Sequence, residues 1–353
     1  MWEALAHIKI EDLADFLDAS DELLSPADKA EIEELYKAGE EFYAIAREHM
    51  TCLPNADADK IVERLLAKKS VVQRTLEWYK QGQRVLTASQ FATITKGART
   101  RGQLVLEKAV DITDINTKPL CVRSMDIRPF DWGIRFEPVI KQFYQHVTHT
   151  LVGDLGRLMH DTRDNLAASP DGLVIEDLSG SIGCRKGRLV EFKAPITRVI
   201  TEEVPKDYWV QMQIQMEVAD VGLCDYFEVR IVSPASNKPY EKPEAEKIIV
   251  EGRSFLIAKK ETEELLRYEY SPWLDSTWEP PIEEDEMILE TIPWFITGYN
   301  LKTVERSTEW FESMKPHIEN FWRDVESAKK GEFILPEVTR KRKAEECKIV
   351  DVE

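Results

Sequence analysis

The chain has 353 residues, of which 43% are hydrophobic and 32% charged, a composition that is typical of a folded globular protein and unlike that of a disordered one. Because no apolar run approaches the roughly 18–20 residues of a membrane span and no basic segment precedes an apolar one at the start, we expect neither a membrane helix nor a secretory signal. The net charge of −18 disfavours nucleic-acid binding, since phosphate contacts need local Lys and Arg, but it does not exclude a basic track beside an acidic cleft.

The cysteines are scattered, odd in number and never paired as C-x-x-C. This pattern argues against a disulfide framework and against a zinc or iron–sulfur site, and it fits a reducing, intracellular setting. The five positions are Cys52, Cys121, Cys184, Cys224 and Cys347.

Residues 1–70 are predicted to form a helical N-terminal extension. Leu13, Phe16 and Leu17 recur at helical spacing, and Ser25-Pro26 is typical of a helix start. The segment holds no catalytic constellation, which indicates an accessory domain or arm.

The middle of the chain, about 71–235, alternates helical stretches with short apolar runs. The turn signal 169–172 (Ser-Pro-Asp-Gly) precedes a short strand at 173–175, and a second strand at 188–193 is stopped by Pro195. Two strands around a glycine-containing break predict a hairpin or a meander.

Residues 207–219 fit two patterns. Apolar residues alternate with glutamines as in a strand, yet Trp209, Met212 and Met216 also form a helical stripe. If the next strand, 226–232, runs parallel to 188–193, the connection needs a crossover, usually a helix. We therefore predict a helix over 207–220, which places Gln211 and Gln215 on one face and Gln213 roughly opposite.

The last third is predicted to contain a strand and then a charged helix over 244–268, followed by an amphipathic helix over 305–329. The charged tail, 331–353, includes the basic run Arg340 to Lys343. That run is interpreted as an import signal, a phosphate-binding arm or a solvated tail.

The chemistry is concentrated in Asp171 and in Glu191-Phe192-Lys193. Alternate residues of a strand share a face, so Glu191 and Lys193 point the same way, and Asp171 reaches the same place if it opens the neighbouring strand. Carboxylates, together with the Phe192 carbonyl, are the oxygen ligands that Mg²⁺ prefers, and a nearby lysine stabilises developing charge. This set predicts phosphodiester cleavage, although a salt-bridged surface strand would look similar.

The surroundings of these residues resemble the PD-(D/E)xK nuclease superfamily, and specifically its lambda-exonuclease or YqaJ-type viral recombinase family. Five sequence blocks between about 73 and 232 occur in that family's order. They are residues 73–78 with 86–89, residues 132–137, residues 167–173, residues 189–195 and residues 208–213. The resemblance implies an α/β fold, a restriction-endonuclease-like core with a mixed central sheet flanked by helices, over 71–330.

The resemblance also implies roles for single residues. It makes Asp171, Glu191, the Phe192 carbonyl and Glu137 metal ligands and Lys193 the catalytic lysine, with Gln211 and Gln213 as an active-site pair. Ser89 matches a hydroxyl that binds a terminal phosphate, although a helix N-cap explains it equally well. Where such enzymes often carry an arginine four residues after the tryptophan of the first block, this chain has Gly82, and Arg84 is the nearby candidate.

The leading hypothesis is a magnesium-dependent DNA exonuclease, 5′-to-3′ on linear duplex, acting in recombination, repair or viral genome processing. A PD-(D/E)xK endonuclease and an inactive DNA-end-binding module are the alternatives. Mn²⁺ is expected to substitute for Mg²⁺, and duplex ends, a single-strand annealing protein and a second copy of the chain are the expected partners. A viral protein of this kind would act in the cytoplasm or nucleus of a host cell. We also predict a local basic track, made of Arg185, Lys186, Arg188, Arg198 and Lys206.

Overall fold

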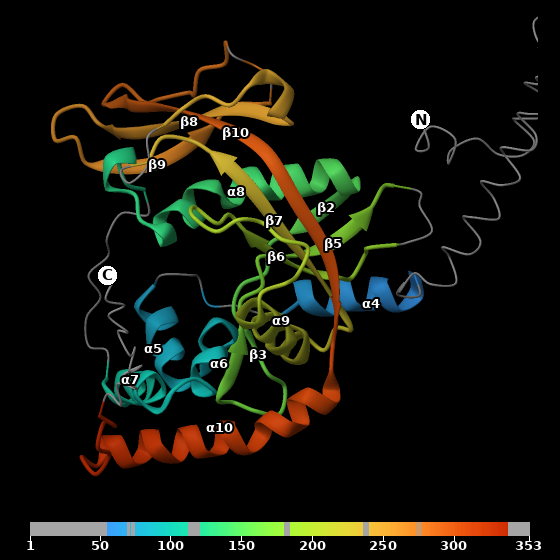
Figure 1. Cartoon of the computed structure of the whole chain (residues 1–353), viewed down its shortest axis with the longest axis vertical. Coiled ribbons are helices and arrows are strands. Elements are labelled where there is room, and N and C mark those ends of the chain that lie inside the picture. The colour runs from blue at the N-terminus through green and yellow to red at the C-terminus, as the bar shows by residue number, and fades with distance from the viewer. Residues whose placement is uncertain are drawn as a thin grey trace, which may run out of the picture.

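The computed structural model describes residues 55–68, 71, 75–111, 121–179, 184–235, 240–273, 275 and 277–337 (Figure 1). Of the predicted N-terminal extension, the described part includes the helix α4 (Asn55–Leu66). Residues 1–54, and the tail from 338 on with its basic run, lie outside the described residues.

A seven-stranded mixed sheet forms the centre of the fold. Its order is β2 (Thr150–Gly153), β5 (Gly172–Asp177), β6 (Leu189–Lys193), β7 (Leu223–Val232), β10 (Glu286–Glu305), β8 (Val250–Lys259) and β9 (Leu265–Tyr270). Strands β6 and β7 are parallel, and the other neighbours are antiparallel. The long strand β10 pairs with β7 at one end and with β8 at the other, and it runs down the molecule in Figure 1.

The crossover between the parallel strands is the helix α9 (Lys206–Ala219), as predicted from the topology. Pro205 precedes its first residue, and Asp220 ends it in a left-handed conformation with φ of 51°. The alternating glutamines of this segment therefore lie on a helix and do not form a strand.

Helices cover both faces of the sheet around β5 and β6. On one face α8 (Pro129–Thr148) packs aromatic side chains against Val190 and Phe192; on the other, α9 packs Met212 and Met216 against Leu189. Further helices build a layer beyond α9, with α10 along the bottom of Figure 1. These are α5 (Leu76–Arg84), α6 (Ala88–Ile94), α7 (Ala98–Ala109) and α10 (Thr308–Lys329).

A small second sheet joins this helical layer to the core. Strand β1 (Leu86–Thr87) is parallel to β4 (Leu166–Ala168), which is antiparallel to β3 (Leu158–Met159). The mixed α/β core with flanking helices that the resemblance implied is thus confirmed. The amphipathic helix predicted for 305–329 is α10, with Ser307 as its N-cap.

The charged helix predicted before residue 268 was wrong. After a turn in which Glu263 has a φ of 52°, residues 265–270 form the edge strand β9 against β8. The Tyr268 hydroxyl donates to the carbonyl of Val122 (2.7 Å), so a contact distant in sequence helps to hold the segment extended. No helix among the described residues is long and apolar enough to cross a membrane.

Candidate active site

Strand β6 presents two different faces. Val190 and Phe192 point into the core under α8, whereas Glu191 and Lys193 point toward α9. Glu191 is fully buried, and the Lys193 ammonium donates to its Oε1. The predicted pairing of an acid and a lysine on one strand face is therefore present.

Asp171 joins this pair from the start of β5. Its Oδ2 accepts the backbone N–H of Phe192 at 2.7 Å, because β5 and β6 are antiparallel and Gly172 lies opposite Val190. A side chain at Gly172 would meet Val152 at 2.4 Å, so the close approach of β2 requires glycine after the aspartate. The Pro-Asp-Gly turn places the second carboxylate beside the first.

Helix α9 supplies the hydrogen bonds to the buried carboxylate. Gln211 Nε2 donates to Glu191 Oε1 (2.7 Å), and Gln215 Nε2 donates to Glu191 Oε2 (2.6 Å). Gln213 does not join them, since its amide bonds the carbonyl of Glu305 (2.7 Å) and the N–H of Ser307 (2.6 Å). Of the pair implied by the resemblance, the structure thus brings Gln211 to Glu191 and not Gln213, and Gln215, one turn after Gln211, is the second glutamine at this carboxylate.

The charges in this cluster shift one another's protonation. Burial, followed by the nearby charges of Glu191 and Glu137, raises the pKa of Asp171 well above its usual value, although Lys193 opposes this. Burial by itself lowers the pKa of Lys193, but Glu191 and Asp171 outweigh it, so that pKa is raised. Lys193 therefore stays an ammonium, and Asp171 holds its proton more tightly than a free aspartate does.

The donor set fits a divalent cation in its chemistry. Asp171 and Glu191 supply hard oxygen ligands, and the two carboxylates lie close enough for the charge of Glu191 to raise the pKa of Asp171, after the larger effect of burial. The charge of Glu137, on α8, also acts on Asp171. Within the described part of the chain, however, no three acidic, histidine or cysteine side chains form a group that could hold a metal ion. The carboxylates of Asp171 and Glu191 are the part of the predicted ligand set that the structure brings together.

Beyond Lys193 the site continues into an aromatic and ionic group. The Lys193 ammonium lies 4.9 Å from the centre of the Tyr208 ring, and the Arg198 guanidinium lies 5.8 Å from it. Arg198 is bound to the buried carboxylate of Glu228, which pairs in register with Lys193. The predicted basic residue Arg198 therefore lies beside the site.

Three other members of the predicted basic track are engaged in ion pairs away from the carboxylates. Arg185 and Arg188 bind the buried Asp225, on the α8 face of the sheet, at 2.5 and 3.2 Å. Lys186 is paired with Asp59 of α4. Two of these cations thus serve a buried ion cluster, which the sequence pattern did not reveal.

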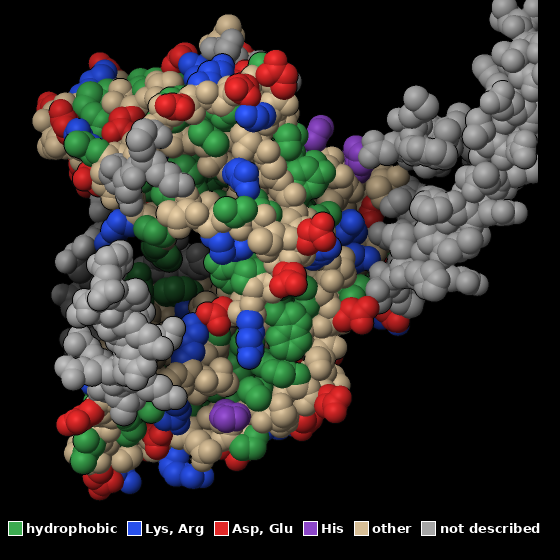
Figure 2. Space-filling model, viewed as in Figure 1, with side chains coloured by type: hydrophobic (Ala, Val, Ile, Leu, Met, Phe, Trp, Pro, Cys, Tyr) green, Lys and Arg blue, Asp and Glu red, His purple; other side chains and the backbone are tan. Residues whose placement is uncertain are grey.

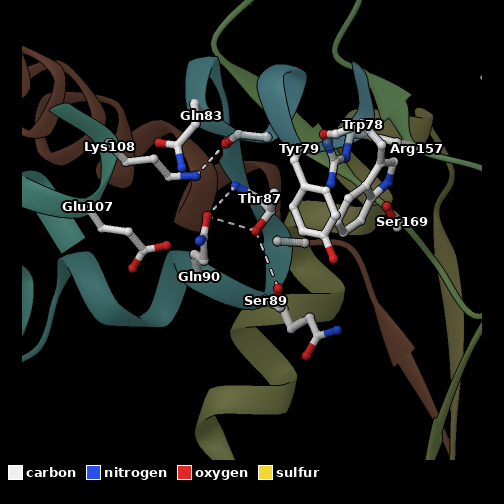
Figure 3. Close-up of a pocket in the computed structure, with 13 residues that line it drawn as sticks. Trp78, Tyr79, Gln83, Thr87, Ser89, Gln90, Glu107, Lys108, Arg157 and Ser169 are labelled. Carbon is white, nitrogen blue, oxygen red and sulfur yellow. Dashed lines mark hydrogen bonds between the residues drawn. The ribbon is translucent and has the colours of Figure 1, made fainter. Parts of the chain in front are cut away.

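A cavity of about 310 Å³ adjoins the carboxylates (Figure 3). Its walls come from α5, α6, α7, α9 and the loop before β3, and they include Trp78, Tyr79, Ser89, Lys108, Arg157 and Gln211. Gln211 belongs to both places, since its amide binds Glu191. The face shown in Figure 2 is hollowed between the helical layer and the upper end of the sheet, with Lys and Arg side chains along the hollow.

Ser89 lines this cavity, as the resemblance implied, and its hydroxyl lies 3.3 Å from that of Thr87. Arg84 does not line it; its side chain is exposed at the end of α5. The arginine in the wall is Arg157, more than 70 positions further along the chain. No local pattern marks Arg157 or Lys108 as cavity residues.

Comparisons with known proteins identify a matching family model and similar chains. Residues 77–222 match the model of the YqaJ-like viral recombinase domain, which confirms the resemblance. The uncharacterized protein R354 of Acanthamoeba polyphaga mimivirus is 24% identical over 299 residues, covering 71% of this chain and 52% of that protein. The chain thus spans about half the length of this curated relative.

Two solved structures show similarity at low sequence identity. One is an alkaline exonuclease from Laribacter hongkongensis, with a TM-score of 0.45, 18% identity and coverage of 73% of this chain and 95% of that chain. The other is a phage related exonuclease from Haemophilus somnus 129PT, with a TM-score of 0.39, 10% identity and coverage of 70% and 96%.

Proposed function

Taking residues 77–222 as a YqaJ-like viral recombinase domain, we propose that the chain is a divalent-metal-dependent deoxyribonuclease, an exonuclease on linear duplex DNA with 5′-to-3′ polarity. The observation that carries this proposal is the convergence of Asp171, Glu191 and Lys193 at the ends of β5 and β6. A family domain could persist without its chemistry, but here the acids, the lysine and the supporting glutamines are all present.

In this proposal Asp171, Glu191 and the Phe192 carbonyl hold Mg²⁺, with Mn²⁺ as a substitute, and the nearby charge of Glu137 adds to the negative field. A bound divalent ion would activate a water and offset charge on the phosphoryl oxygens. Lys193, kept charged by its carboxylate neighbours, stabilises the negative charge that develops as water attacks phosphorus and the P–O bond to the leaving alcohol breaks. Gln211 and Gln215 hold both oxygens of Glu191 in place.

The test uses linear and closed circular duplex DNA, with and without Mg²⁺, and compares the wild type with Lys193→Ala. We expect metal-dependent release of mononucleotides from linear DNA, intact circles and almost no release by the variant. Lys302→Ala, which removes an exposed lysine of β10, is the matched control and should behave as the wild type. Nicking of closed circles would favour an endonuclease, and cleavage by Lys193→Ala at the wild-type rate would refute the site.

Metal binding is checked separately from cleavage. Mg²⁺ should raise the melting temperature of the wild type, because a ligand that binds only the folded state stabilises it. Asp171→Asn should lose most of this rise, whereas Glu176→Asn, an exposed position on the same strand β5, should keep it. Equal rises in the two variants would contradict the assignment of Asp171 as a ligand.

A further inference from the structure

Lys193 and a metal ion would compete for the same carboxylate. The Oε1 atom of Glu191 accepts hydrogen bonds from the Lys193 ammonium and from the amide of Gln211, and a carboxylate oxygen has two lone pairs for such bonds. The other oxygen, Oε2, accepts the amide of Gln215 at 2.6 Å. A cation that binds Glu191 therefore meets an ammonium on the same carboxylate, and the two positive charges repel each other.

Glu228 is a second buried carboxylate on the same face of the sheet. It lies on β7 directly opposite Lys193, just as Tyr226 lies opposite Glu191. Partners in a parallel register point to the same face, and their strands are about 4.8 Å apart, so Glu228 and Lys193 are neighbours under α9. Burial raises the pKa of Glu228, and the charges of Arg198 and Lys193 oppose this rise. The ammonium is thus close enough for its charge to act on this carboxylate.

One oxygen of Glu228 is bound and the other is not. The Arg198 guanidinium donates to Oε1, whereas Oε2 is buried and has no hydrogen-bond partner among the described residues. The residue as a whole is 0% exposed. A buried carboxylate oxygen without a donor costs folding free energy, which a new donor would recover. Oε2 of Glu228 is therefore an open acceptor on the strand next to Lys193.

The two cations of this group differ in how firmly they are held. Arg198 binds Glu228, donates to the Tyr226 hydroxyl at 3.3 Å and lies beside the Tyr208 ring, which itself stacks on Tyr226 at 5.9 Å between ring centres. Lys193 has an ion pair with one carboxylate and a flexible four-carbon stem with three rotatable donors. The lysine is therefore the cation that can change its partner while the arginine stays in place.

We propose that Glu228 is a second acceptor for the Lys193 ammonium, which moves from Glu191 to Glu228 Oε2 when a divalent cation binds Asp171 and Glu191. The inference rests on the proposed metal-dependent function, and Glu228 is a positioning residue because it acts through Lys193. The move leaves Glu191 to the cation and keeps the lysine charged beside the site. With one N–H bound to Glu228, the ammonium has two further N–H groups for a reacting phosphate.

The test measures Mg²⁺ binding in the absence of DNA, from the rise in melting temperature as Mg²⁺ is added. Glu228→Gln keeps the shape of the side chain but removes the charge that attracts the ammonium. Lys193 then stays on Glu191, and we expect the apparent Kd for Mg²⁺ to increase about tenfold. Glu217→Gln, which neutralises a carboxylate of α9 that binds Arg306, is the matched control and should leave the Kd within about twofold of the wild type.

A second background separates the position of the lysine from the loss of a negative charge. In Lys193→Met no ammonium has to move, so adding Glu228→Gln should change the Kd for Mg²⁺ by less than about threefold. Comparing the two backgrounds cancels the direct effect of the Glu228 charge on the metal ion. An increase of equal size in both backgrounds would come from charge alone and would overturn the proposal.

Arg198→Met tests the same idea with the opposite sign, and it serves if Glu228→Gln does not fold. Without the arginine, both oxygens of Glu228 attract the Lys193 ammonium before any metal is added. Glu191 is then already free, and the Kd for Mg²⁺ should decrease about threefold or more, but only in chains that keep Lys193. A Kd that is unchanged, or that decreases equally in Lys193→Met, would contradict the proposal.

A crystal structure with Ca²⁺ gives a readout that does not depend on affinity. Lys193 Nζ should lie about 2.7–3.2 Å from Glu228 Oε2, and an ammonium that still binds Glu191 beside the ion would overturn the proposal. The binding data also separate this inference from the proposed function. A wild type that shows no rise in melting temperature with Mg²⁺ would refute the metal site and this inference with it. A normal rise with the same Kd in Glu228→Gln would overturn this inference alone.

Discussion

Asp225 and Glu191 are both fully buried carboxylates on the paired strands β6 and β7, one on each face of the sheet. Asp225 faces α8 and receives two arginines, together with the hydroxyls of Tyr144 (2.7 Å) and Thr303 (2.8 Å). Glu191 faces α9 and receives two neutral amides and a single lysine, with the carboxylate of Asp171 nearby.

The difference lies in what neutralises each charge. Around Asp225 two arginines and two hydroxyls of the chain bind the single carboxylate, so its acceptor sites are filled without a ligand. Around Glu191 two carboxylates lie beside a single lysine. A buried carboxylate whose acceptors are all bonded by the chain's own donors belongs to the structural core. Two buried carboxylates beside a single cation are suited to binding a further cation.

The largest expected effect is a loss of stability when Asp225 is changed. Asp225→Asn leaves two arginines facing each other in the interior, and breaking a buried pair in this way costs about 3–5 kcal/mol. We expect a loss of that size in the free energy of unfolding, measured by urea denaturation. Asp154→Asn, which removes an exposed partner of Lys141, should cost about 1 kcal/mol or less. Equal losses in the two variants would mean that the Asp225 cluster is not structural.

Neutralising Glu191, the buried carboxylate on the other face of the sheet, should lower activity. Glu191→Gln removes a charge from the proposed metal site while keeping the shape of the side chain, and we expect the rate of the proposed cleavage to fall by about 10²–10³-fold. Because it relieves repulsion with Asp171, the free energy of unfolding without metal should change little. Near-wild-type cleavage by Glu191→Gln in limiting Mg²⁺ would refute the assignment of Glu191 as a metal ligand.

Two glutamines of α9 allow the same comparison within one helix, because Gln215 binds Glu191 whereas Gln213 binds the end of β10. Gln215→Met removes a donor from Glu191, so the rate or the apparent Mg²⁺ affinity should drop about tenfold or more. Gln213→Met instead leaves a carbonyl and an N–H at the end of β10 without their partner, which should cost about 1–3 kcal/mol of stability. The Mg²⁺ dependence of Gln213→Met should match the wild type, and a shifted dependence would place Gln213 in the site after all.

The smallest effect concerns the cavity and its pH dependence. The pKa of Lys108 is lowered from 10.5 to about 8 in the folded protein, so the folded state binds this proton less tightly than the unfolded one. Its contribution to stability is therefore fully present above the unfolded pKa and is lost as the pH falls through about 8. Lys108→Met should not show this trend in the free energy of unfolding, measured by urea denaturation between about pH 7 and 10. An equal trend in the variant and the wild type would mean that Lys108 is not its source.

The sequence by itself determined the strand that bears Glu191 and Lys193 and favoured the crossover helix. A strand alternates its faces, so Glu191 and Lys193 had to point the same way, whereas the position of Asp171 depended on its opening the neighbouring strand, as it does. The rule that parallel strands need a helical crossover settled 207–220, and helical geometry already put Gln215 beneath Gln211. These are local rules, readable from spacing alone.

Only the tertiary structure decided the contacts between distant segments. The resemblance alone assigned Gln213 to the site, but the end of β10 binds that amide. No residue near position 82 predicts that the Arg157 guanidinium lies beside Gly82. The charge pattern before residue 268 likewise does not predict that this segment pairs with β8. Periodicity fixes which face a side chain takes, whereas its partner depends on which segments the folded chain brings alongside it.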